Sequence, residues 1–209
     1  MEPLFVICYY YPMLNRKLHI VLVFGLDDGK LNFPALLSPV WNRNNVCLYS
    51  IRVGWRDGGE YQQKQQAVVD LVDKLLATGD PVAVIGISAG ASLAINVYEQ
   101  RPQLIGMVSV CGALRLPVEL PKRFAQSVAS STAFRQSLAA CEASQRRLTP
   151  AQLSRIHYFE PWRDFVPIST MRLNGAKMHR LAGLNHSISI VTAMLLYRRT
   201  IIRFLKQAA

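Results

Sequence analysis

The sequence predicts an α/β protein built on a doubly wound, mostly parallel sheet of about six to seven strands, with helices on both faces and a small helical lid. Apolar runs rich in β-branched residues, which are typical of strands buried on both faces, alternate with amphipathic stretches of helical length. The connections are long enough to carry crossover helices between parallel strands. Because the 209 residues show no shift in composition and 51% of them are hydrophobic, we expect one domain, 1–209, with 112–154 as a lid or cap insertion.

The first half of the chain holds most of the predicted strands. Apolar runs predict strands at Leu4–Tyr9, His19–Phe24 and Val46–Val53, at the run that begins with Val82, and at Leu104–Cys111. A loop signal at 25–30 follows the second of these runs, and an asparagine-rich turn precedes the third. Helices are predicted at Glu60–Ala77, where apolar residues recur at helical spacing, and from the end of the Val82 strand to about Gln100.

The second half interrupts this alternation once. Residues 112–154 contain two prolines and a Ser/Ala-rich stretch with rough helical spacing, and they are too long for a simple connection. We interpret them as a small helical lid, with an ordinary crossover and a long loop as the alternative. Further strands are then predicted at Ile156–Phe159 and at about Ala176–Leu181, followed by a long helix at roughly Ser187–Lys206.

Residues 86–90, Gly-Ile-Ser-Ala-Gly, join a predicted buried strand directly to a predicted helix. A turn of this kind forces Ser88 into a strained backbone conformation, and Gly86 and Gly90 must be small for strand and helix to approach each other. The strain exposes the serine hydroxyl beside the unpaired N–H groups at the start of the helix. This arrangement suits acyl transfer, so we predict Ser88 as a nucleophile, with a purely structural turn as the alternative.

A serine nucleophile needs a base within hydrogen-bonding reach and an acid that orients the base. Of the four histidines, only His186 lies in a loop directly after the last predicted strand, so it is the predicted base, with a helix-capping or surface role as the alternative. Asp164, beyond the preceding strand, is the predicted acid. Glu160 is its rival, and a surface ion pair with Arg163 is the other interpretation. Parallel strands deliver their carboxyl ends to one edge of the sheet, so Ser88 and its two partners are expected to converge there.

Together these features resemble a compact member of the α/β-hydrolase superfamily, whose triad follows the order Ser, acid, His. The resemblance covers roughly Leu18 to Lys206. It rests on the elbow at 86–90, on Asp-Phe-Val-Pro at 164–167, which is similar to the sequence that often carries the family's acid, and on His186 before a final helix. The chain is shorter than the usual eight-stranded form, so we expect one or two N-terminal strands to be missing or abbreviated.

The resemblance implies an oxyanion hole formed by two backbone N–H groups. One belongs to Ala89, directly after the nucleophile, and the other to Leu26, which follows Gly25. Asp27 and Asp28 lie close to this loop, where negative charge opposes a developing oxyanion. They are interpreted as part of a solvated loop, or alternatively as groups that bind a cationic or hydroxylated part of the substrate. The family requires neither a metal nor an organic cofactor.

Composition limits the other classes of function. The formal net charge is +11, but no run of Lys and Arg exceeds two residues, so we expect a solvated basic surface and no specific nucleic-acid partner. The scattered cysteines indicate reduced thiols and a cytoplasmic location rather than a disulfide framework or zinc site: Cys8, Cys47, Cys111 and Cys141. Neither a signal peptide nor a transmembrane segment is predicted.

The leading hypothesis is a cytoplasmic serine hydrolase that cleaves a small-molecule carboxylic ester or thioester through an acyl-enzyme on Ser88. Two alternatives stay open. In the first, the chain is a non-catalytic protein that keeps the same fold and binds an anionic partner through its basic lid. In the second, it is an acyltransferase that uses the same three residues.

Overall fold

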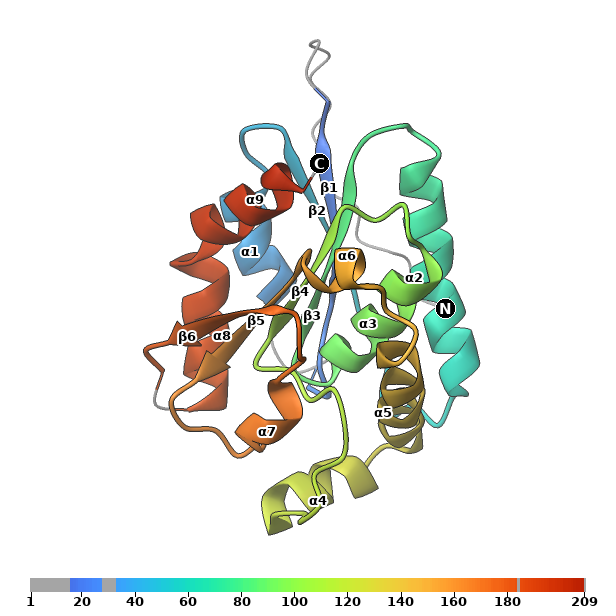
Figure 1. The fold of residues 1–209 in the computed structure, drawn as a ribbon, viewed down its shortest axis with the longest axis vertical. Helices are drawn as coiled ribbons and strands as arrows, with labels where there is room; N and C mark the ends of the chain where they lie inside the picture. The colour runs from blue at the N-terminus through green and yellow to red at the C-terminus, as the bar shows by residue number, and fades with distance from the viewer. Residues whose placement is uncertain (1–15, 28–32, 184, 209) are drawn as a thin grey trace.

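A computed structural model describes residues 16–27, 33–183 and 185–208. Within these residues, six parallel strands form one sheet: β1 Leu18–Val23, β2 Val46–Ile51, β3 Val82–Ile87, β4 Gly106–Val110, β5 Ile156–Pro161 and β6 Lys177–Leu181 (Figure 1). The predicted parallel α/β sheet is therefore confirmed. The strand predicted at Leu4–Tyr9 lies outside the described residues.

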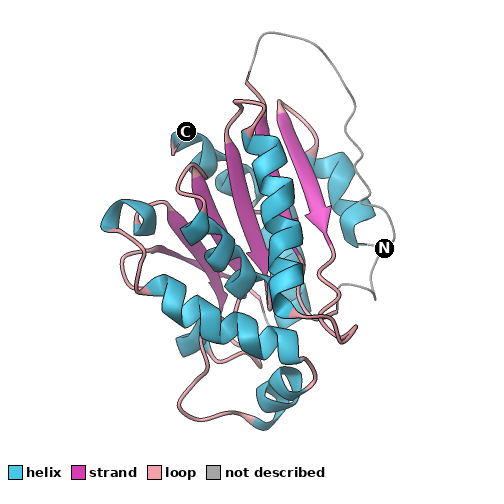
Figure 2. Ribbon diagram, turned by 90° about the vertical axis from the view of Figure 1, so that its right-hand side faces the viewer, coloured by secondary structure: helices cyan, strands magenta, loops and turns pink. Residues whose placement is uncertain are grey.

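Helices cover both faces of the sheet, as predicted. The described residues contain α1 Phe33–Trp41, α2 Tyr61–Leu76, α3 Gly90–Gln100, α4 Lys122–Ala129, α5 Thr132–Gln145, α6 Pro150–Leu153, α7 Ile168–Met171, α8 His186–Leu195 and α9 Arg198–Gln207. Figures 1 and 2 show α1, α8 and α9 on one face and α2, α3 and α5 on the other. The sequence did not predict α1, because its nine residues include an internal proline, Pro39, and leave little helical periodicity to detect.

The strand order places a crevice beside the end of β1. The order is β2-β1-β3-β4-β5-β6, so the chain leaves β1 toward one edge of the sheet and returns to its other side with β3. Ligands of open parallel sheets bind outside the carboxyl ends of the strands, at the point where the strand order reverses. At this point Val23, the last residue of β1, pairs with Gly86, one residue before the end of β3. Every residue of β1 and β3 is buried, so the crevice stands on a rigid core.

The final helix predicted at Ser187–Lys206 is divided into two helices, α8 and α9. The break has a physical cause in a residue from α1. The indole N–H of Trp41 donates to the carbonyl of Met194 at 2.8 Å. This carbonyl would otherwise accept the N–H of Arg198 in a continuous helix, so the indole replaces a helical bond and stabilises the turn between α8 and α9.

The segment 112–154, predicted as a lid, contains α4, α5 and α6. Helix α5 packs against α3 and α2 on one face of the sheet, in the position of a crossover helix between β4 and β5. Helix α4 packs against α5 and lies beyond the strand ends, at the bottom of Figure 1. Only the first part of the segment, with α4, therefore extends away from the sheet.

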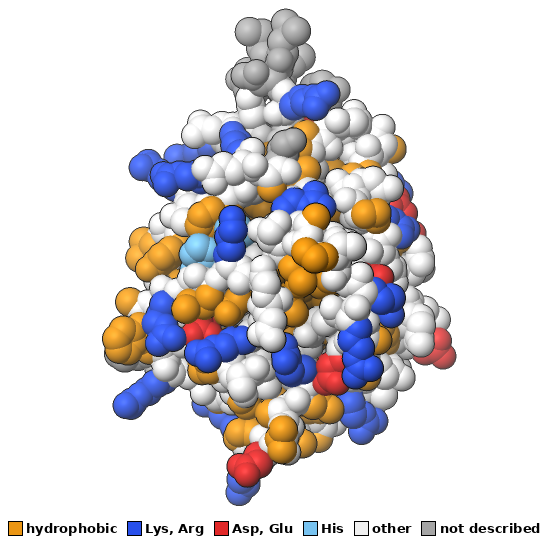
Figure 3. Space-filling model, in the orientation of Figure 1, with side chains coloured by type: hydrophobic (Ala, Val, Ile, Leu, Met, Phe, Trp, Pro, Cys, Tyr) orange, Lys and Arg blue, Asp and Glu red, His pale blue; other side chains and the backbone are white. Residues whose placement is uncertain are grey.

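Basic side chains are dispersed over the face of the molecule shown in Figure 3. Lys and Arg are interrupted there by polar and apolar atoms, and acidic groups are few. Among the described helices, none has the length and apolar character that crossing a membrane requires.

Candidate active site

Ser88 occupies a strained turn between β3 and α3. Its φ is +53°, in the left-handed region that non-glycine residues rarely adopt. The close crossing of strand and helix explains the glycines on either side, because a Cβ at Gly86 would lie 2.4 Å from the Cα of Ala91, and one at Gly90 would lie 2.2 Å from the carbonyl oxygen of Val23. The predicted elbow geometry is therefore present in the structure.

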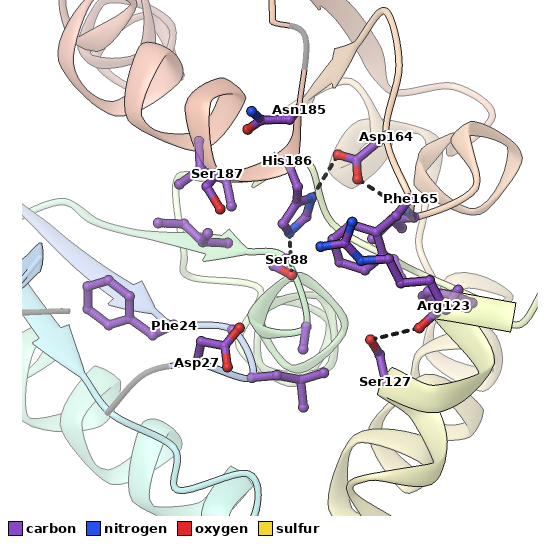
Figure 4. A pocket seen from close by; sticks show the side chains of 18 of the residues that line it. Phe24, Asp27, Ser88, Arg123, Ser127, Asp164, Phe165, Asn185, His186 and Ser187 are labelled. Carbon is purple, nitrogen blue, oxygen red and sulfur yellow. Dashed lines mark hydrogen bonds and ion pairs between the residues drawn. The ribbon is translucent and has the colours of Figure 1, made fainter. Parts of the chain in front are cut away.

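His186 is the first residue of α8 and lies between Ser88 and Asp164 (Figure 4). Its Nε2 is 2.8 Å from the hydroxyl oxygen of Ser88, and its Nδ1 is 2.7 Å from Oδ2 of Asp164. In the tautomer protonated at Nδ1, the ring donates to the carboxylate and accepts from the serine hydroxyl. The side chain of Asn185 caps α8 by accepting the N–H of Ile188 at 2.9 Å, which fixes the point at which His186 enters the helix.

The carboxylate of Asp164 is fully buried behind His186. Its second oxygen, Oδ1, accepts the backbone N–H of Val166 at 3.0 Å, so both oxygens are bonded and the side chain has one orientation. The rival carboxylate, Glu160, is equally buried, but it forms ion pairs with Arg172 at 2.9 Å and Arg180 at 2.8 Å. The structure thus brings Asp164, and not Glu160, to the histidine.

The loop after β1 lies against Ser88. A Cβ on Gly25 would stand 2.7 Å from the Cβ of Ser88 and 3.2 Å from its Oγ, so only glycine fits there without displacing a neighbour. The indole N–H of Trp55 donates to the Phe24 carbonyl at 2.8 Å, and the Trp55 side chain is only 2% exposed. No local pattern in the sequence predicted this role for Trp55, because the contact spans 31 residues and depends on how β2 ends beside β1.

Arg56 holds the next part of the same loop. Its Nη1 donates to the Leu26 carbonyl at 3.2 Å and to the Asp27 carboxylate at 3.0 Å. The negative charge of Asp27 is therefore balanced by a guanidinium next to the predicted oxyanion loop. Ala89, the other predicted donor, is buried directly before α3 begins. Asp28 lies outside the described residues.

A cavity of about 800 Å³ opens above Ser88 and His186. Its walls are mostly apolar, with side chains from α4, α5, α8 and the loop after β5: Phe124, Phe134, Phe165, Ile188, Ile190 and Val191. Gly25, Leu26, Asp27 and Ala89 also line it. The sequence predicted the polar centre but not these walls. The high amphipathicity of α4, which buries Phe124 and Val128, was an available signal that this helix packs over something apolar.

The other three histidines make contacts away from this cavity. His19 lies 3.2 Å from Asp80 and 3.0 Å from the Tyr49 hydroxyl, near the amino end of β1. His157 and His179 lie side by side on β5 and β6, with Nδ1 of His157 2.9 Å from Nε2 of His179. Burial, and then the neighbouring His179, lower the pKa of His157 to about 4.

The described residues contain no cluster of His, Cys, Asp and Glu able to hold a metal ion. Among the described residues, Cys47, Cys111 and Cys141 form no disulfide. Cys8 lies outside the described residues. Burial raises the pKa of the Cys141 thiol to about 12, so this side chain stays protonated and unreactive at neutral pH.

Several solved structures resemble this chain. A metagenome-derived lipolytic enzyme matches over 92% of this chain and 94% of its own, with 14% sequence identity and a TM-score of 0.63. Human thioesterase 2 matches over 92% and 98% respectively, with 16% identity and a TM-score of 0.59. Carboxyl esterase 2 from the mycorrhizal fungus Tuber melanosporum matches over 96% and 82%, with 14% identity and a TM-score of 0.63. No protein-family model and no curated protein matches the sequence.

Proposed function

The chain has the α/β-hydrolase fold, and from this premise we propose that it is a serine hydrolase that cleaves a carboxylic ester or thioester through an acyl-enzyme on Ser88. The observation that carries the proposal is the unbroken chain of hydrogen bonds from Asp164 through His186 to Ser88. The three residues come from distant parts of the chain. His186 lies 98 residues after Ser88 and 22 residues after Asp164. A scaffold without catalysis has no chemical need for this arrangement.

The reaction proceeds in two steps. His186 accepts the hydroxyl proton while Ser88 attacks the substrate carbonyl, and the resulting imidazolium is stabilised by Asp164. The imidazolium then donates the proton to the leaving alcohol or thiol, which departs and leaves an acyl-enzyme. Water, activated by His186 in the same way, attacks the acyl-enzyme and releases the acid and free Ser88.

The oxyanion of each tetrahedral intermediate is stabilised by the N–H groups of Ala89 and Leu26. The first stands at the start of α3, where the helix dipole also favours negative charge. The second belongs to the loop whose carbonyls are bonded by Trp55 and Arg56. Donors fixed in advance cost no reorganisation during the reaction, and the loss of one donor costs about 2.7–4 kcal/mol in such sites.

The predicted lid enters this proposal in a narrower form. Helix α4 lines the cavity and packs mainly against α5, whereas α5 packs on α3 as a crossover helix. We assign the covering role to the residues around α4 alone. The lid then excludes water from the cavity when an acyl chain lies against Phe124 and Phe165.

The experiment that tests this function is hydrolysis of a panel of nitrophenyl esters and acyl thioesters by the wild type and by Ser88→Ala. We expect measurable turnover by the wild type and a loss of at least 10³-fold in the variant, whose fold is verified by circular dichroism. Turnover that is unchanged in Ser88→Ala for every active substrate contradicts the proposal. Analysis of the products with added alcohols or amines separates hydrolysis from acyl transfer, because a transferase forms the new ester or amide.

A further inference from the structure

The positive and negative side chains that line the cavity do not all pair with one another. Asp164 is bonded to His186, and Asp27 is bonded to Arg56, so both carboxylates have a partner. Arg123 and Arg163 also line the cavity, and neither forms an ion pair with any described residue. The cavity therefore contains two cations that no described carboxylate pairs with, and Arg123 is the one that lies against the ring in contact with His186.

Arg123 is an exposed residue at a position that is unfavourable for a positive charge. It is the second residue of α4, at a helix amino terminus where the dipole disfavours positive charge. Its guanidinium carbon lies 4.4 Å from the centre of the Phe165 ring, and the T-shaped contact of Phe165 with the His186 ring has centroids 4.7 Å apart. Figure 4 shows the side chain extending from α4 toward His186 and Ser88. Arg123 is thus connected to the catalytic histidine through a single aromatic ring.

The stacking on Phe165 prepares the guanidinium for a ligand. When the flat face of a guanidinium lies on an aromatic ring, its N–H donors still point outward in the guanidinium plane. They can then bind a carboxylate or phosphate in a fork. The contact with the ring restricts the flexible side chain, so less conformational entropy is lost when an anion binds. Apolar side chains, Phe124 and Val191 among them, form a large part of the same cavity wall. A ligand suited to this cavity therefore combines hydrocarbon with an anionic group.

We propose that Arg123 is a specificity-determining residue that binds an anionic group, a carboxylate or phosphate, carried by the ester or thioester substrate. This inference rests on the proposed function, because it concerns the substrate that Ser88 attacks. The anionic group belongs either to the acyl part or to the leaving group. Both sources present the same oxyanion chemistry to the guanidinium, and the experiment distinguishes them.

Two matched pairs of substrates separate these sources. For the acyl part, the nitrophenyl monoester of glutaric acid is compared with nitrophenyl pentanoate, which has an equal chain length and no carboxylate. For the leaving group, butyryl-coenzyme A, which carries phosphates, is compared with the butyryl thioester of N-acetylcysteamine, which is neutral. Each pair is measured with the wild type, Arg123→Gln, Arg123→Lys and a control, Arg135→Gln. Arg135 is exposed on α5 and does not line the cavity, so its variant removes the same charge elsewhere.

We expect the wild type to prefer the anionic member of one pair. Arg123→Gln is expected to reduce kcat/KM for that substrate by about tenfold or more, mainly through KM, and to change the neutral partner less than twofold. Arg123→Lys recovers part of the loss, because it restores the charge but not the planar fork. Arg135→Gln is expected to match the wild type. Equal losses for anionic and neutral substrates, or no loss in Arg123→Gln, overturn the inference.

A binding measurement separates failure of this inference from failure of the proposed function. Ser88→Ala, which cannot turn over an ester, is titrated by calorimetry with the anionic and neutral members of each pair, with and without Arg123→Gln. Tighter binding of the anionic member that depends on Arg123 supports the inference even when no substrate is hydrolysed. Hydrolysis of neutral esters with no binding preference for anions supports the proposed function and refutes the role of Arg123.

Discussion

Replacing Gly25 by alanine tests whether the loop after β1 and the elbow must approach each other as closely as the structure shows. A Cβ at this position would stand 2.7 Å from the Cβ of Ser88, about 0.7 Å short of ordinary contact at 3.4 Å. It would also lie 3.1 Å from the carbonyl oxygen of Ile87. Either the loop with Leu26 or Ser88 has to move, and a displacement approaching 1 Å in a catalytic site costs about 10²-fold in rate.

We therefore expect Gly25→Ala to lower kcat for an active ester by about 100-fold, measured by steady-state kinetics. The control is Gly58→Ala, in a turn outside the main cavity, where a Cβ meets nothing within 4 Å but φ is +80°. That variant is expected to lose about 1 kcal/mol of unfolding free energy and to keep its kcat. A folded Gly25→Ala protein that keeps at least half of the wild-type kcat would show that the loop and the elbow need not approach each other so closely.

Three further predictions concern the supports of the site. Trp55→Phe removes the indole N–H from the Phe24 carbonyl without removing the aromatic packing, so we expect a loss of about 1–3 kcal/mol in unfolding free energy and a reduced kcat. Asn185→Ala removes the cap of α8 and is expected to cost about 1 kcal/mol, while Asn185→Asp keeps the cap and most of the stability, both measured by urea unfolding. Burial lowers the pKa of His157 to about 4. Below about pH 6.5, therefore, the unfolded chain binds a proton that the folded protein does not. The free energy of unfolding then falls by up to about 3 kcal/mol as the pH drops from about 6.5 to about 4. Urea unfolding at pH 7 and pH 4.5 is expected to show this fall in the wild type and a smaller one in His157→Gln.

A Trp55→Phe protein with wild-type stability and kcat would show that the indole bond does not hold the loop. Equal losses in Asn185→Ala and Asn185→Asp would remove the capping explanation. A pH dependence of stability that is the same in His157→Gln and the wild type would show that other groups cause the loss of stability in acid.

The parallel sheet and the meeting of its functional residues were predictable because local signals determine them. Buried runs such as Val82–Ile87 specify strands by composition, and the elbow motif marks the end of one strand without any knowledge of its neighbours. Asp164 and His186 followed from topology, since residues after parallel strands gather at one edge of the sheet. The hydrogen bonds at 2.7 and 2.8 Å connect the three residues that this reasoning selected.

The features that escaped prediction depend on contacts between distant segments. The break between α8 and α9 depends on Trp41, which lies 153 residues before Met194. The same holds for the approach of Arg123 to Phe165, since nothing in the local sequence of α4 indicates which ring its first turn will meet. Residue patterns report which face of an element is buried, and they do not report the partner that buries it.

Covalent labelling with a fluorophosphonate probe, followed by peptide mass mapping, shows directly whether Ser88 is an activated nucleophile. It requires an activated serine and no knowledge of the substrate. We expect one phosphonylated residue, Ser88, in the wild type, and no labelling of Ser88→Ala or His186→Ala, each verified as folded. Absence of labelling in well-folded wild type, or equal labelling of His186→Ala, would contradict the assignment of Ser88 and His186 as nucleophile and base.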